Sequence, residues 1–114
     1  MEGAGLSTLE YHVLLSMASG ARYGYAIKST VEAESAGTLT PRAGSLYRLL
    51  ARLMTRGLVR EVSPQEATAP HPGRERRYYG LTAEGRAALA AEARRLKEAA
   101  ALAEERLGVA GGRP

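Results

Sequence analysis

The stretch Thr40–Arg60, TPRAGSLYRLLARLMTRGLVR, constrains the fold more than any other part of the chain, because it predicts one amphipathic helix with clear ends. Thr40 and Pro41 form a start signal, since a threonine hydroxyl can accept a bond from a free backbone N–H and proline has its φ already set. Gly57 is the matching stop, because glycine takes the left-handed conformation past a last helical turn. We therefore expect a helix over residues 41–56.

The two faces of this helix differ in chemistry when residues are placed at about 100° intervals. One face is apolar: Ala43, Leu46, Tyr47, Leu49, Leu50, Leu53 and Met54. The other is polar and basic: Ser45, Arg48, Arg52, Thr55 and Arg56. From Thr38 to Arg60 there are five arginines and no acidic residue, whereas ordinary solvated faces mix both signs of charge. The pattern is typical of a DNA recognition helix, and a solvated surface helix is the alternative.

Two further helices precede this segment. Ser7 and Glu10 fit a capping box, which predicts a first helix running to about Ser19 before Gly20. A tight turn at residues 21–24 leads into a second helix that reaches about Ala36. The order of helix, turn, helix, loop and arginine-faced helix predicts a helix-turn-helix unit.

The segment after Gly57 predicts two strands, over residues 58–62 and 76–81, joined by a proline-rich loop. Alternation would place Arg77, Tyr79 and Leu81 on one face of the second strand, and Arg76 and Tyr78 on the other. Arginines cluster at the far end of the loop: Arg74, Arg76 and Arg77. Two strands with a basic loop predict a wing that reaches the DNA backbone or the minor groove beside the major groove occupied by the helix. The alternative is a plain hairpin that covers the core.

The last segment predicts one long helix that begins after Thr82 and ends near Leu107. Its apolar residues alternate in spacings of four and three, which is typical of a coiled-coil seam: Leu89, Ala93, Leu96, Ala100, Ala103 and Leu107. About 25 helical residues exceed what so small a core can cover, so we expect the seam to pair with a second copy, assisted by Leu6 and Leu9. The alternative is a helix that packs on its own domain.

The predicted fold class is thus mainly α with a small β-hairpin, a winged helix-turn-helix plus a long C-terminal dimerisation helix. The expected parts are a DNA-binding domain over residues 1–81, the dimerisation helix over 82–107 and a flexible tail over 108–114. The chain has 114 residues, no cysteine and a net charge of +4, which favours one domain and an anionic partner. The N-terminal segment lacks the basic residues of a signal peptide and nothing is long enough to span a membrane, so we expect a cytoplasmic protein without membrane contact.

Three motifs resemble the PadR family of bacterial winged-helix transcriptional regulators: YGYAI at 23–27, GSLYRLLARLMTRGLV at 44–59 and GRERRYYGLTAEGR at 73–86. The single last helix is similar to that of the short PadR subfamily. The resemblance implies a homodimer that binds an operator on double-stranded DNA and usually represses transcription. It also implies that Arg42, Ser45, Tyr47 and Arg48 stand where the family meets DNA, and that Tyr79, Leu81 and Thr82 close the wing.

Together these arguments predict eight DNA-binding residues: Arg42, Ser45, Tyr47, Arg48, Arg52, Arg74, Arg76 and Arg77. Some members of the family release DNA when a small aromatic compound binds at the dimer interface. Several of these ligand-sensing members have an aromatic residue at the dimer interface. The predicted seam here contains only leucine and alanine, so an inducer is possible but the sequence does not support one.

Catalytic, cofactor and metal sites are not expected. His12 and His71 are the only histidines, they are not spaced as a metal pair, and no glycine-rich phosphate loop is present. Two alternatives to a PadR-like regulator are a winged-helix protein-interaction module that never binds DNA and a regulator of the MarR type. The arginine-only front argues against the first, and the second predicts a different helix order around the wing.

Overall fold

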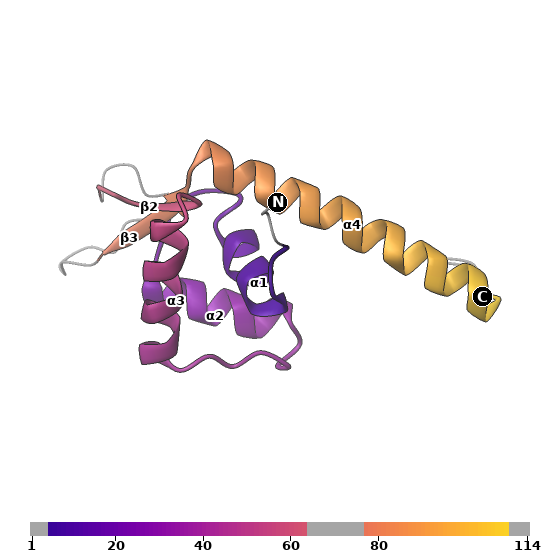
Figure 1. The fold of residues 1–114 in the computed structure, drawn as a ribbon. Coiled ribbons are helices and arrows are strands. Elements are labelled where there is room, and N and C mark those ends of the chain that lie inside the picture. Colours follow the sequence, from indigo (N-terminus) through magenta and orange to yellow (C-terminus); the bar gives the residue numbers. More distant parts are fainter. Residues whose placement is uncertain (1–4, 64–76, 110–114) are drawn as a thin grey trace.

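The computed structural model describes residues 5–63 and 77–109 (Figure 1). Within them the elements follow the order α1 (Thr8–Ser16), β1 (Arg22–Tyr23), α2 (Gly24–Glu34), α3 (Ala43–Thr55), β2 (Val59–Val62), β3 (Tyr78–Leu81) and α4 (Ala83–Leu107). The first three helices form a compact body, and the wing strands and α4 leave it on different sides. The predicted fold class, a winged helix-turn-helix with a long last helix, is confirmed.

Helix α1 begins at the predicted capping box. The Glu10 N–H donates to the Ser7 hydroxyl at 3.1 Å, and the Ser7 N–H donates to the Glu10 carboxylate at 2.8 Å. The helix ends at Ser16, three residues before the predicted end, and residues 17–20 form turns.

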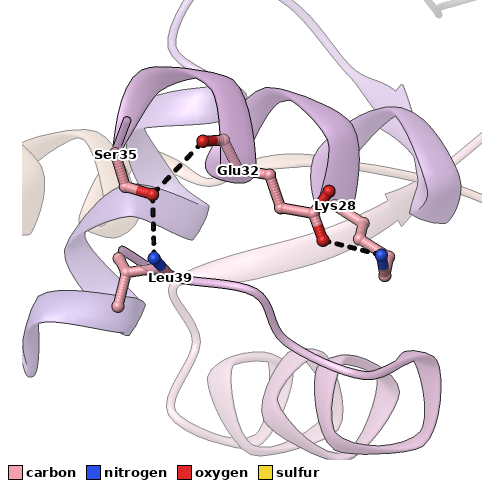
Figure 2. Close-up of polar contacts among 4 residues, drawn as sticks. All are labelled: Lys28, Glu32, Ser35 and Leu39. Carbon is pink, nitrogen blue, oxygen red and sulfur yellow. Dashed lines mark hydrogen bonds and ion pairs between the residues drawn. The ribbon is translucent and has the colours of Figure 1, made fainter. Parts of the chain in front are cut away.

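The connection from α2 to α3 is held by side-chain bonds at the end of α2 (Figure 2). The Ser35 hydroxyl accepts the Leu39 N–H at 3.0 Å and donates to the Glu32 carbonyl at 3.4 Å, while Lys28 and Glu32 form an ion pair at 2.7 Å. Ala36 and Gly37 both have positive φ, 55° and 79°, so the chain reverses within a few residues. These contacts fix the first residues of the loop that connects α2 to α3.

The wing has three strands instead of the predicted two. Arg22 and Tyr23, predicted as a turn, form a short strand that pairs antiparallel with β3, so β3 lies between β1 and β2. Tyr23 and Tyr78 meet edge to face at 5.8 Å between ring centroids. Tyr78 and Tyr79 of this central strand are both buried.

Helix α3 starts two residues later than predicted. Arg42 is the N-cap residue and makes no side-chain capping bond, so the capping role predicted for Thr40 is wrong. Pro41 is buried ahead of the helix, and proline restricts the residue before it to extended conformations. The predicted stop is confirmed: Gly57 has φ 78°, and the Leu58 N–H bonds back to the Leu53 carbonyl at 3.0 Å.

The end of α3 is joined directly to the start of α4. Thr82 caps α4 by accepting the Gly85 N–H at 2.9 Å, and its hydroxyl donates to the Gly57 carbonyl at 2.6 Å. The backbone N–H of Thr82 bonds to the Leu58 carbonyl at 3.1 Å. The position of the recognition helix is therefore tied to the first turn of α4.

The core is built on aliphatic side chains from α1, α2 and α3, closed by the sheet and the first turns of α4. Its members are Val13, Leu14, Met17, Ile27, Val31, Leu46, Leu49, Leu50, Leu53, Leu58, Val59, Tyr79 and Leu89. Every residue of α4 from Ala93 to Leu107 is exposed. More than half of this helix consequently stands free of the protomer, as Figure 1 shows.

Candidate DNA interface

The outer face of α3 carries the predicted basic front. Arg42, Ser45, Arg48 and Arg52 are all exposed, and the Arg48 guanidinium donates to the Ser45 hydroxyl at 3.4 Å. Among residues 5–63 and 77–109, no carboxylate pairs with Arg42, Arg48 or Arg52. The first turn of α3 also contains no acidic residue, so the positive end of the helix dipole is not offset there. The structure thus brings four of the predicted side chains onto one cationic surface.

Two residues assigned to the apolar back of this helix lie outside the core. Ala43 is exposed, and Tyr47 is 45% exposed. Tyr47 packs against Tyr79 of β3, with ring centroids 6.5 Å apart, at the edge between the helix and the sheet. The helical wheel places Tyr47 at the border of the apolar face, where the neighbouring element decides its burial.

Arg56 belongs to the same face but is held by an acid. Its guanidinium lies 3.4 Å from the Glu10 carboxylate, the same group that closes the α1 capping box. This pair joins α1 to the C-terminal end of α3. It reduces the positive charge that Arg56 can offer to an anionic partner.

The wing is described only at its base. Arg74 and Arg76, predicted to contact DNA, lie outside the described residues. Arg77 is exposed, but it forms two hydrogen bonds with Glu61 on the opposite strand, at 2.9 and 3.3 Å, and it lies 5.7 Å from the centre of the Tyr79 ring. The bonded guanidinium holds the pKa of Glu61 below its ordinary value, and Glu61 raises that of Arg77.

Burial raises the pKa of Tyr79, while the charge of Arg77 acts in the opposite direction. Arg77 is thus ion-paired within the wing, and its contact with DNA stays a prediction. Sequence reasoning missed this arrangement because Glu61 and Arg77 are far apart along the chain and meet only through strand pairing.

An exposed aromatic side chain to which the sequence reasoning gave no role lies within the helix-turn-helix. Tyr25, in the first turn of α2, is 65% exposed. The available signal was the position of Tyr25 within the YGYAI motif, two residues after a partly buried Tyr23. An aromatic with its hydroxyl in solvent can bond to phosphate oxygens, which accept bonds from tyrosine in many DNA complexes.

The predicted dimer residues fall into two groups in the protomer. Leu89 is buried in the protomer's own core, and Leu6 and Leu9 are partly buried against it. The remaining five are exposed along the free part of α4: Ala93, Leu96, Ala100, Ala103 and Leu107. Leu6 and Leu96 border the same hollow, of about 160 Å³, where α1 meets α4. The exposed seam therefore continues into the surface of α1.

The junction of α1 and α4 contains a buried acid that sequence reasoning did not single out. Glu92 is 5% exposed and is bonded to Arg95 on the next turn. The Arg95 guanidinium, with a smaller effect from the Leu6 backbone N–H, holds the pKa of Glu92 below its ordinary value. Glu92 thereby ties the N-terminal segment to α4 beside the seam.

No group of three or more potential metal ligands occurs in the described part of the chain. Across the same residues, none of the helices combines the length and apolar character that a membrane crossing requires.

Solved structures share this architecture. A PadR-like transcriptional regulator from Bacillus cereus is 22% identical and has a TM-score of 0.72. The match covers 87% of this chain and 90% of that chain. A PadR family transcription regulator from Clostridium difficile is 20% identical, with coverages of 89% and 99% and a TM-score of 0.70. Bacillus subtilis PadR in complex with operator DNA is 24% identical, with coverages of 73% and 45% and a TM-score of 0.58. At these identities the likeness concerns the fold. A comparison with curated protein sequences finds no match.

The family itself is shown by sequence. The model of the transcriptional regulator PadR-like family matches residues 13–91, which is more than half of the chain and includes α2, α3 and the wing strands. The prediction that the chain is not an enzyme agrees with this family of transcription regulators. The chain with the arginine-faced recognition helix described above belongs to the PadR-like family of DNA-binding transcriptional regulators.

Proposed function

We propose that this protein is a homodimeric repressor that binds a two-fold operator with α3 in the major groove and the wing beside it. The observation that carries the proposal is the exposed face of α3, where Arg42, Arg48 and Arg52 have no acidic partner among the described residues. A helix with its base-facing side chains on one exposed surface and its back in the core can enter a major groove. The repressor role rests on the resemblance to the family.

The dimer is supported by the free half of α4. Exposed leucines and alanines along the part of α4 beyond the core favour pairing with a second copy. Leu96 is 39% exposed and Leu107 is 77% exposed. In this arrangement residues 1–81 form the DNA-binding domain and residues 82–107 the dimerisation helix, and two recognition helices about 34–36 Å apart would meet successive major grooves.

Binding to duplex DNA is expected to weaken steeply with salt. Each neutralised phosphate releases counterions and contributes a slope of about −0.9 in log K against log salt, so several arginine contacts per protomer should produce a slope of several units. Fluorescence anisotropy with a duplex from the chain's own promoter region, titrated from low to high salt, measures this slope. A slope near zero, or equal binding to an unrelated duplex, would contradict the proposal and favour a protein-interaction module.

Replacement of Arg48 by alanine is expected to weaken operator binding by about 1–3 kcal/mol and to relax specificity at one base position, because arginine can bond to both acceptors of a guanine edge. Arg94→Ala removes the same charge from an exposed position of α4, outside the recognition helix, and serves as the control. Selection from a library of randomised operators measures both changes. Equal loss over all sequences would show that Arg48 contacts only phosphate.

A further inference from the structure

Gly24, the first residue of α2, is buried directly beneath Tyr47 of α3. A Cβ built at this glycine would lie 2.7 Å from Tyr47 Cζ and 3.0 Å from Cε1, and still closer to the hydroxyl oxygen. Contacts below 3.0 Å are not tolerated, so no side chain fits at position 24 while Tyr47 keeps its place. The tyrosine ring occupies the space that the missing side chain leaves.

The backbone does not explain this glycine. Gly24 is helical and is not among the residues with positive φ, the conformation for which glycine is usually needed. A glycine in a helix is also less stabilising than alanine. The steric contact with Tyr47 is therefore the structural reason for glycine here.

The Tyr47 ring also packs against a buried residue of the sheet. Tyr79 is 1% exposed in β3, and its ring centroid lies 6.5 Å from that of Tyr47. Tyr79 is fixed by burial and by Arg77, which is bonded in turn to Glu61. The Tyr47 ring thus contacts both the first turn of α2 and the wing strand, while the residue remains 45% exposed at the edge of the recognition helix.

We propose that Gly24 is a positioning residue for DNA recognition that acts through Tyr47. The absence of a side chain at position 24 leaves the space in which the Tyr47 ring packs against α2 and β3. This inference rests on the proposed function, in which the outer surface of α3 and its edges meet DNA. Tyr47 is half exposed at the end of a flexible side chain, so an added methyl group would displace the ring into solvent and leave the core in place. The orientation of Tyr47 toward DNA would change, while the fold would remain.

Gly24→Ala is expected to weaken operator binding about tenfold, the size of one lost contact, with an unchanged circular dichroism spectrum and unchanged dimer. Tyr47→Ala should weaken it by a similar factor. In the Tyr47→Ala background, Gly24→Ala should have no further effect, because the clash is gone. This cancellation would show that Gly24 acts through Tyr47, and the unchanged spectrum and dimer would separate the effect from a loss of folding. Wild-type affinity of Gly24→Ala, or equal weakening in both backgrounds, would overturn the inference.

A measurement without DNA separates this inference from the proposed function. Nuclear Overhauser contacts between the rings of Tyr47 and Tyr79 are expected in the wild-type protein and should be lost in Gly24→Ala. If the wild-type protein binds no duplex specifically, the proposed function fails, together with the role of Gly24 in recognition. If the ring contacts persist in Gly24→Ala, the seating argument itself is wrong.

Discussion

Leu96→Glu is expected to abolish the dimer and operator binding together, although every arginine of α3 remains in place. Leu96 lies near the middle of the seam, and it is 39% exposed in the isolated protomer, so the substitution should leave the protomer folded. In the dimer it would bury two like charges across the two-fold axis, which an interface of leucine and alanine cannot offset. The loss of operator affinity should reach about 100-fold or more, the gain that two linked modules provide over one.

Sedimentation and anisotropy on the same sample test this expectation. Leu102→Glu is a matched control, because Leu102 is also a leucine of α4, is 47% exposed and lies off the seam. The control should remain dimeric and bind normally. If Leu102→Glu dissociates and Leu96→Glu does not, the dimer uses another face of α4. A Leu96→Glu protein that stays dimeric and binds its operator would rule out the seam as the interface.

Gly85→Ala is expected to lower the free energy of unfolding by about 1–3 kcal/mol, the usual cost of overpacking a close contact. Its Cβ would lie 2.9 Å from the carbonyl carbon of Leu58 and closer still to the carbonyl oxygen. These are backbone atoms, so no side-chain rotation relieves the clash, in contrast to Gly24. The first turn of α4 would be pushed away from the segment that ends the recognition helix, which also carries the bond from Thr82 to Gly57.

Urea unfolding measures the change, with Gly44→Ala as the matched control. Gly44 is also in the first turn of a helix, but a Cβ there would meet only the Arg48 side chain, at 3.5 Å. Alanine at position 44 should be neutral or stabilising, since it favours the helix by up to about 1 kcal/mol over glycine. Equal effects of the two substitutions would show that the contact between α4 and Leu58 is not tight in solution.

Features that depend on residues close together in the chain were predictable from the sequence. The capping box of Ser7 and Glu10, the glycine stop at Gly57 and the Thr82 cap are all present. Each arises from a bond or a backbone conformation spanning a few residues, so its signal survives without knowledge of the fold. The leucine face of α3 was predictable for the same reason, since its period follows from helical geometry alone.

Tertiary structure alone decided where the edges of those elements lie and which charges remain available. Two residues of β1 carry no periodic signal, and they become a strand only because β3 offers an edge to pair with. Strand pairing also brings Glu61 to Arg77, which compensates a charge that the sequence assigned to DNA. Tyr47 leaves the apolar face because Gly24 and Tyr79 provide its seat. The sequence therefore determined the helix that carries the arginines, whereas contacts between distant segments determined which of the neighbouring arginines are paired with an acid.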